Sequence, residues 1–421
     1  MDTARLDDGL LRTRAPNGLT VLSETLPGVR SVAMGIWVQT ASAHEDPCRM
    51  GVSHLLEHMV FKATERRTAR QLALELEIRG GSLDAYTSRD HTSYQAHVLD
   101  ADLPVAVDIL TDLVRRPLLR QSDLDTERNV VLEEISGVSD TPDDLVFELH
   151  AATMWPEHPY GFPILGTTET VGSLTATDLQ ELHGAGYYPG NCVIAAAGHL
   201  EHDELLGSLD HEGWFNGSAE RDSWSPVAQG TAARGVARIE RRDTTQAHIV
   251  MGSEAFPYSD DRRYALSMLI NALGGGMSSR LFQRVREDMG LAYAIYAYQQ
   301  LYRSAGQIGI YVGTQPGTAP QAVEAINGEL ARLAQEGLPA TELAEVKQQL
   351  KGQVMLSLEG TTSRMNRLAT MALHDEPYRP LDDILARIDR VTMDETASVS
   401  HELFDPERQT TVILGPAVRE P

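Results

Sequence analysis

The sequence His54-Leu55-Leu56-Glu57-His58 places two imidazoles and a carboxylate within little more than one helical turn. Positions i, i+3 and i+4 share one face of a helix, so these three side chains point to the same side. Two neutral imidazole nitrogens can bind one Zn²⁺, and a catalytic zinc keeps one coordination position open. The stretch therefore predicts a metal site on a helix, with Glu57 as a base beside the metal. Two solvated histidines on a surface helix remain the alternative.

Two histidines and a water leave a catalytic zinc one protein ligand short. Glu134 is the natural candidate, because it falls on one helical face with Glu127 and apolar neighbours. A carboxylate on an apolar face needs a partner, so Glu134 is predicted to bind the metal. Glu127, two turns earlier on that face, is predicted to orient a ligating histidine. Either acid taken alone could equally be a solvated helix charge.

The residues around the motif alternate between strand-like and helix-like patterns. Two short β-branched and apolar runs, 18–22 and 31–38, predict adjacent strands separated by Pro27-Gly28. The other elements expected in the first half are strands at 91–99 and 192–198 and helices at 51–62, 68–79, 103–116 and 122–138.

A similar order recurs after the polar stretch 216–235, which predicts a linker between two halves, 1–215 and 236–421. The elements expected there are strands at 247–252 and 307–312 and helices at 264–273, 279–288 and 320–336. The recurrence favours an internal duplication. Its alternative is that strand-then-helix order is common to all α/β chains.

Composition limits the function classes. Asp and Glu number 60 against 36 Lys and Arg, and the net charge of -24 would repel nucleic acid and anionic lipid. The only cysteines, Cys48 and Cys192, are too few for a disulfide framework, which fits a reducing compartment. The chain has no apolar run of the ~18 residues that a membrane span needs. We expect a cytoplasmic protein that binds neither nucleic acid nor membrane.

The motif, with Glu127 and Glu134 on a later helix, resembles the inverted zinc metallopeptidases of the pitrilysin, insulin-degrading enzyme and mitochondrial processing peptidase family. The type is that of the short, two-domain bacterial members. Asp84-Ala85-Tyr86-Thr87 is similar to the edge strand with which the family pairs its substrate. In the second half, Arg286 and Tyr293 resemble an Arg/Tyr pair of the family. The likeness covers nearly the whole chain.

The resemblance implies an α+β fold of two homologous α/β halves, each a mainly antiparallel sheet with helices packed on one face. It also implies one zinc per chain, with His54, His58 and Glu134 as ligands and Glu127 as the supporting acid. Glu57 would take the proton from a zinc-activated water. Arg286 and Tyr293 would reach from the second half to the substrate carbonyl and the developing oxyanion.

The function implied is a zinc-dependent endopeptidase that hydrolyses peptides or unfolded segments inside a closed chamber, formed by a homodimer. A catalytically silent subunit of the same fold, or one that depends on a partner, is the alternative. Asp84 keeps the partner-dependent alternative open, because the family commonly has Asn there and a carboxylate cannot donate a hydrogen bond as an amide does. Manganese or cobalt could replace zinc at such a site.

Overall fold

The computed structural model describes residues 1–217, 227 and 230–416, so residues 218–226 and 228–229 of the predicted linker lie outside the described residues. The chain forms two compact units, and each is assembled from separate segments. Unit 1 comprises Met1–Ile135, Pro163–Val227 and Leu356–Tyr378, and unit 2 comprises Ser136–Phe162, Ala228–Met355 and Arg379–Pro421.

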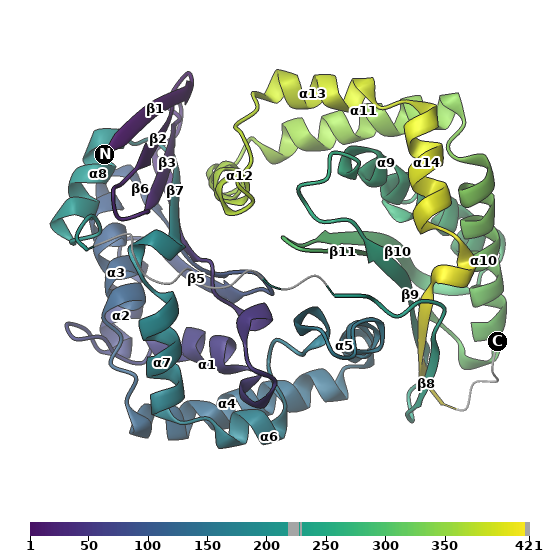
Figure 1. Ribbon diagram of the computed structural model, residues 1–421, viewed down its shortest axis with the longest axis horizontal. Helices are drawn as coiled ribbons and strands as arrows, with labels where there is room; N and C mark the ends of the chain where they lie inside the picture. The colour runs from purple at the N-terminus through teal and green to yellow at the C-terminus, as the bar shows by residue number, and fades with distance from the viewer. Residues whose placement is uncertain (218–226, 228–229, 417–421) are drawn as a thin grey trace. The chain divides into compact units, whose positions relative to one another are not determined.

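Unit 1 is built on a sheet of seven strands in the order β1-β2-β3-β7-β4-β6-β5 (Figure 1). Every neighbouring pair is antiparallel except β3 and β7, which are parallel. The strands are β1 Asp2–Asp7, β2 Leu10–Arg14, β3 Thr20–Thr25, β4 Ser31–Val38, β5 Ser82–Thr87, β6 Thr92–Leu99 and β7 Cys192–Gly198. β5 is therefore an outermost strand, with one edge of its backbone unpaired by any described strand.

The prediction that the runs 18–22 and 31–38 form adjacent strands is wrong. Both runs form strands, β3 and β4, but β7 lies between them and pairs with each. β7 is buried at every position. A strand of apolar and small residues is most stable at the centre of a sheet, where both of its edges are hydrogen-bonded and both of its faces are covered. This long-range pairing outweighs the closeness of β3 and β4 in the sequence.

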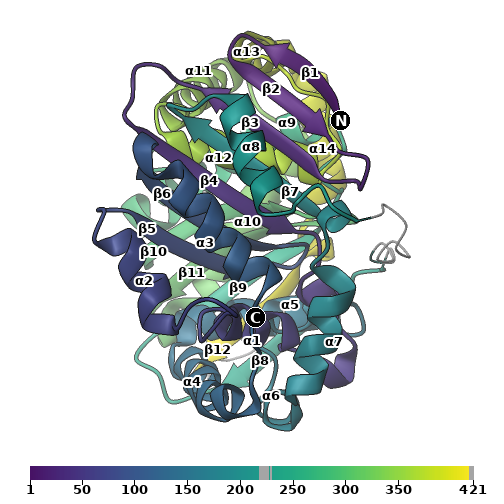
Figure 2. The ribbon, with the colours of Figure 1, turned by 90° about the vertical axis from the view of Figure 1, so that its left-hand side faces the viewer.

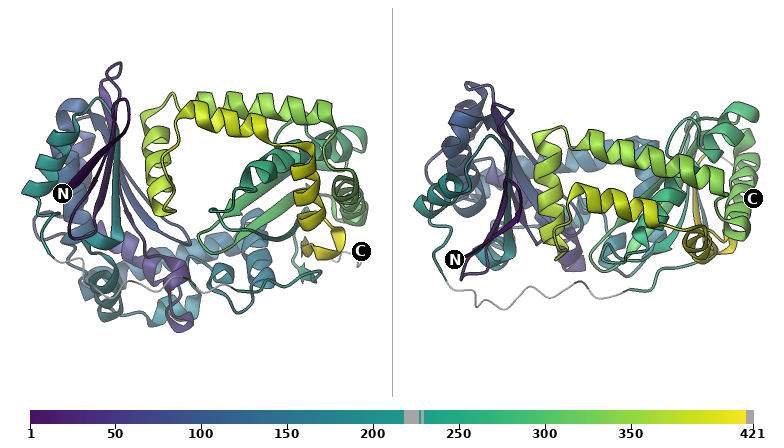
Figure 3. Two further views of the ribbon diagram at one scale, coloured as in Figure 1. Left: turned by 45° about the horizontal axis from the view of Figure 1, so that its top comes forward. Right: turned by 90° about the horizontal axis from the view of Figure 1, so that it is seen from above.

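Both faces of the unit 1 sheet are covered by helices. Along β4, Val32, Met34 and Ile36 pack into the core that includes α1 and α3, whereas Ala33 and Trp37 pack against residues of α12. Figure 3 shows α12, in yellow-green, beside the other face of the sheet. Figure 2 shows α3 and α8 crossing the first of these faces. The helices of this part of the chain are α1 Val52–Val60, α2 Ala69–Glu77, α3 Leu103–Arg115, α4 Gln121–Asp140, α6 Thr168–Ser173, α7 Ala176–Gly186, α8 His202–His211 and α12 Thr361–Leu373.

Unit 2 repeats this topology with five strands in the order β10-β11-β9-β12-β8. The order matches β5-β6-β4-β7-β3 of unit 1, and the parallel pair, β12 with β8, occupies the same place. The strands are β8 Ala237–Arg241, β9 Ala247–Ala255, β10 Ala292–Leu301, β11 Gly306–Thr314 and β12 Thr410–Gly415. The helices are α5 Pro142–Met154, α9 Arg263–Gly274, α10 Ala319–Glu336, α11 Ala340–Ser357, α13 Leu381–Arg390 and α14 Met393–Leu403. The recurrence expected from the sequence is thus accompanied by a recurrence of strand order.

Each unit takes one helix from the opposite half of the sequence. α5 precedes the linker but packs on β9 and β12 of unit 2, where Val146 joins Val250 and Val412 in one apolar cluster. α12 follows the linker but packs on β3, β4 and β7 of unit 1. The division into domains 1–215 and 236–421 stays a prediction. The structure shows in addition that each compact unit contains a helix from the other half of the sequence.

The predicted fold class is confirmed: the chain is an α+β protein with two mainly antiparallel sheets and helices packed against them. The sequence did not anticipate that a further helix covers the second face of each sheet. The predicted helix at 279–288 differs in type, because Phe282–Asp288 forms a π-helix. A π-helical turn is uncommon and often occurs at functional sites. Among the described helices, none is both long enough and apolar enough to cross a membrane.

The packing of α12 predicts the effect of truncating its apolar face. Leu368 is 1% exposed and contacts the cluster that contains Leu10, Leu22 and Trp37. Leu368→Ala should lower the free energy of unfolding by about 2–5 kcal/mol, because it leaves a cavity in a packed core. Chemical denaturation followed by circular dichroism measures the change. Leu356→Ala is the control, since Leu356 is 75% exposed; equal stability of the two variants would contradict the assigned packing.

Candidate active site

The helix α1 carries the motif with its two faces in different surroundings. Leu55, Leu56 and Met59 are buried in the core of unit 1. His54, Glu57 and His58 lie on the opposite, partly exposed side of the helix. The apolar residues thus fix the rotation of α1 about its own axis, and this rotation presents the three polar side chains together.

The structure brings His54, His58 and Glu134 together, as predicted from the sequence. Glu134 Oε2 lies 3.7 Å from His54 Nε2 and 3.6 Å from His58 Nε2. One ligand atom from each residue lies within 4.8 Å of the other two. Zinc bonds of about 2.0–2.2 Å in tetrahedral geometry would place ligand atoms roughly 3.3–3.6 Å apart. The two nitrogens and one oxygen therefore fit a zinc ion with little rearrangement.

The imidazole of His54 is held in the form that binds metal. Its side chain is 12% exposed, and burial, assisted by the neighbouring His58, lowers its pKa from 6.5 to about 4. A lowered pKa keeps the ring uncharged at neutral pH, and only an uncharged imidazole nitrogen can coordinate a cation. Binding a metal therefore requires no proton to leave His54 near pH 7.

Glu127 supports the second histidine. Its Oε1 lies 3.0 Å from His58 Nδ1, and the Glu127 side chain is 6% exposed. When Nδ1–H donates a hydrogen bond to this carboxylate, the lone pair of Nε2 is left free on the side of Glu134. The other oxygen of Glu127 is paired with Lys62. The orienting role of Glu127 stays a prediction, for which this contact supplies the geometry.

Glu57 lies beside the three candidate ligands and is held by a strand residue. Thr87 Oγ1 donates a hydrogen bond of 2.6 Å to Glu57 Oε2. Burial raises the pKa of Glu57 above its ordinary value, while the Thr87 hydrogen bond and His58 oppose the rise. A carboxylate with a raised pKa is a stronger base, as a general base requires.

The residues predicted to pair with substrate form the edge strand β5. Asp84 and Tyr86 lie on its exposed side, whereas Leu83 and Ala85 pack against the core. Thr87 is part of the same strand, but its side chain is occupied by Glu57. Because β6 is the only described strand that pairs with β5, the outer edge of β5 offers backbone groups to an extended peptide.

Arg286 and Tyr293 belong to unit 2 and contact each other. The Arg286 guanidinium lies 5.1 Å from the centre of the Tyr293 ring and 4.6 Å from that of Phe282. Tyr293 is 79% exposed. Stacking between two rings limits the positions that the guanidinium can take. Their contact with a substrate held by unit 1 stays a prediction.

Two residues near the motif were missed in the sequence analysis. Lys62 pairs with Glu127, and its spacing of four from His58 could have suggested a shared face. Glu45 accepts hydrogen bonds from the first turn of α1. No sequence pattern marks Glu45, because it lies in an irregular segment before the helix.

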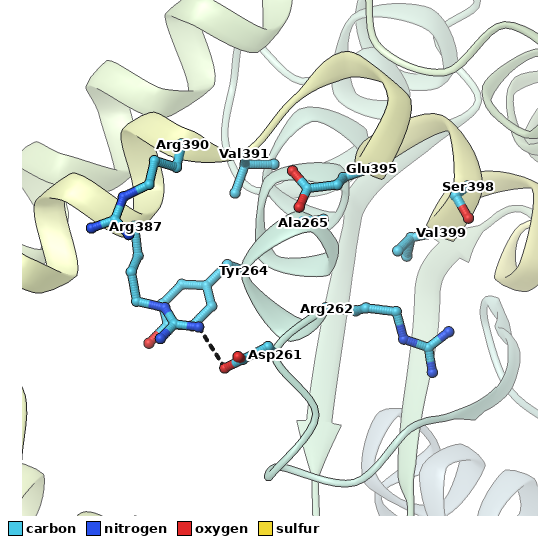
Figure 4. A pocket seen from close by; sticks show the side chains of 10 residues that line it. All are labelled: Asp261, Arg262, Tyr264, Ala265, Arg387, Arg390, Val391, Glu395, Ser398 and Val399. Atoms are coloured by element: carbon cyan, nitrogen blue, oxygen red, sulfur yellow. Dashed lines mark ion pairs between the residues drawn. The ribbon is translucent and has the colours of Figure 1, made fainter. Parts of the chain in front are cut away.

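A separate cavity of about 390 Å³ lies in unit 2, between α9, α13 and α14 (Figure 4). Two of its arginines form ion pairs: Arg387 lies 2.6 Å from Asp261, which also lines the cavity, and Arg262 lies 2.7 Å from Glu402, which does not. The residues that line this cavity include none of the predicted site residues. The chemistry indicated by the sequence is therefore not located there.

The family of the chain follows from comparison with known proteins. The family model described as insulinase (peptidase family M16) matches residues 20–168, which contain the motif, Glu127 and Glu134. A second model, described as peptidase M16 inactive domain, matches residues 173–350. This chain belongs to peptidase family M16.

Bacterial relatives in the M16 family match along nearly the whole chain. An uncharacterized zinc protease of Streptomyces coelicolor is 37% identical over 96% of this chain and 89% of its own length. An uncharacterized zinc protease of Bacillus subtilis is also 37% identical, over 97% of this chain and 99% of its own length. These names support the resemblance to zinc peptidases stated from the motif.

Solved structures share the M16 fold. A protease from Helicobacter pylori matches with a TM-score of 0.91 at 20% identity, over 97% of this chain and 99% of that one. A peptidase M16 inactive domain from Pseudomonas fluorescens matches with a TM-score of 0.90 at 19% identity, over 98% of this chain and 100% of that one. The likeness confirms the fold of the chain.

The convergence of ligand atoms in this M16 protein predicts the effect of removing one of them. Glu134→Gln should weaken zinc binding by at least about 100-fold, because even an outer partner of a zinc ligand contributes 10–100-fold. Glu133→Gln is a matched control, since the neighbouring Glu133 carboxylate is exposed on the same helix. Competition with a fluorescent zinc chelator measures both dissociation constants. Equal affinities in the two variants would remove Glu134 from the ligand set.

Proposed function

We propose that the protein is a zinc-dependent endopeptidase that hydrolyses peptides or unfolded segments of polypeptide. The observation that carries the proposal is the convergence of His54, His58 and Glu134 beside the base candidate Glu57. Two imidazole nitrogens and one carboxylate oxygen are a donor set typical of catalytic zinc. Membership in peptidase family M16 agrees with this chemistry.

His54, His58 and Glu134 would hold the metal. Bound zinc would supply Lewis acidity to the scissile carbonyl and to the attacking water. Glu127 keeps His58 oriented through the hydrogen bond of 3.0 Å to Nδ1. Lys62 holds the second oxygen of that carboxylate and offsets its charge in a buried position.

Glu57 would act as the general base and then as the general acid. Its Oε2 accepts the Thr87 hydrogen bond, which leaves Oε1 to take a proton from the attacking water. The water oxygen would form a bond to the carbonyl carbon while the carbonyl double bond opens to a tetrahedral oxyanion. The protonated Glu57 would then give the same proton to the peptide nitrogen as the carbon–nitrogen bond breaks and the carbonyl double bond re-forms, which returns Glu57 to its starting state.

The substrate would bind as an extended chain along β5. Main-chain hydrogen bonds to an edge strand give affinity with little dependence on side chains. Asp84 lies on the exposed side of this strand. Its carboxylate would accept hydrogen bonds from a peptide but could not donate them. We further propose that Arg286 and Tyr293 contact the substrate carbonyl, where charge develops during the attack. A homodimer and a cytoplasmic location remain parts of the proposal.

The role of Glu57 predicts a separation of metal binding from activity. Glu57→Gln should retain zinc, because Glu57 is not one of the converging ligands, and should lose peptide hydrolysis by about 10²–10⁴-fold, as is typical for a lost general base. Cleavage of a quenched fluorescent peptide library, with metal content measured on the same samples, tests both points. Glu133→Gln is again the control and should keep full activity.

The same assay separates the proposal from its alternative. A wild-type chain that holds one zinc and cleaves no peptide would favour the catalytically silent or partner-dependent subunit. An active Glu57→Gln variant would instead remove Glu57 from the role of base while leaving a peptidase in place.

A further inference from the structure

The first turn of α1 is capped by a residue that lies outside the helix. Glu45 Oε2 accepts the N–H of Gly51 at 2.8 Å, and Glu45 Oε1 accepts the N–H of Ser53 at 2.8 Å. Glu45 is 7% exposed, and burial raises its pKa from 4.5 to about 7. Removing a carboxylate from water is costly unless it is hydrogen-bonded. The two N–H groups at the start of α1, which have no partner within the helix, supply these hydrogen bonds to both oxygens of Glu45.

The helix cannot cap itself at this end. Its N-cap residue is Gly51, which has no side chain to accept a hydrogen bond, and α1 has no acidic residue in its first turn. Gly51 has φ +89°, and an added Cβ would lie 2.5 Å from Leu165 O. A serine, threonine or aspartate cap is therefore excluded at Gly51 by its conformation and by the close backbone of Leu165. The carboxylate of Glu45, six residues before Gly51, caps the helix instead.

A second contact fixes the same end of α1. Thr170 Oγ1 donates a hydrogen bond of 2.8 Å to Met50 O, next to the close approach of Gly51 and Leu165. The start of α1 is thus held from two sides, by the segment of Glu45 and by the segment 165–170. His54 lies about one turn after Gly51, and Glu57 lies about two turns after it.

We propose that Glu45 is a positioning residue for the active site, because its carboxylate fixes the first turn of α1 and thereby the places of His54 and Glu57. In its ionised form the carboxylate also stabilises the helix N-terminus electrostatically. The effect on turnover rests on the proposed function, whereas the effect on zinc binding does not. Glu45 itself contacts neither the metal ligands nor Glu57 through any described hydrogen bond or ion pair.

Glu45→Gln tests the proposal with little change of shape. The side-chain amide of glutamine has one acceptor oxygen and one donor nitrogen. The variant can therefore accept a hydrogen bond from only one of the two N–H groups, and its NH₂ group faces the other. We expect zinc binding to weaken about 10-fold or more and kcat to fall about 10-fold or more, while KM changes less than about threefold. Glu65→Gln is the control, because Glu65 is an exposed carboxylate in the same part of the chain.

Circular dichroism and the unfolding midpoint show whether the variant retains its fold. A folded Glu45→Gln with the zinc affinity and kcat of the Glu65→Gln control would overturn the proposal. If wild type cleaves no peptide, the proposed function fails, but the difference in zinc affinity between the two variants still decides the role of Glu45.

Hydrogen exchange on the wild-type protein tests the cap without any substitution. The amides of Gly51 and Ser53 should be protected about as strongly as that of Leu55, which bonds to Gly51 O within the helix. Fast exchange at Gly51 and Ser53 beside a protected Leu55 would overturn the proposal even if Glu45→Gln does not fold.

Discussion

The hydrogen bond between His58 Nδ1 and Glu127 Oε1 joins the helix of the motif to the helix that supplies the third candidate ligand. Because Glu127 and Glu134 lie on one face of α4, the contact that orients His58 also sets where Glu134 meets α1. Lys62 holds the same carboxylate from the other side. The site therefore depends on how α1 and α4 are positioned along each other. The rest of unit 1 holds the two helices in that position.

The sheet of unit 1 provides the rigid base for these helices. Its central strands are buried on both faces, with α1 and α3 on one side and α12 on the other. Residues after the linker are thus needed to complete the unit that holds the metal candidates. In unit 2, α5 completes the other sheet in the same way. This exchange of helices makes each unit depend on both halves of the sequence, which favours a chain that folds as a whole.

Local spacing was sufficient to predict part of the site. His54, Glu57 and His58 follow from helical periodicity, and Glu134 and Glu127 from their place on an apolar face. The place of β7 between β3 and β4 was not predictable in this way, since it depends on pairing between segments far apart in the sequence. Periodicity can mark an apolar face on α12 but not the sheet on which that face packs, so it could not assign α12 to unit 1. Glu45 was missed because a cap supplied from outside a helix leaves no local pattern.

The most direct test of this account is the position of zinc in crystals of the zinc-loaded protein, measured by anomalous diffraction at the zinc absorption edge. The account predicts one strong peak per chain, about 2.0–2.2 Å from His54 Nε2, His58 Nε2 and a carboxylate oxygen of Glu134. Glu57 should lie near the peak without binding it. A peak held by other residues, or no peak between α1 and α4 at saturating zinc, would contradict the account.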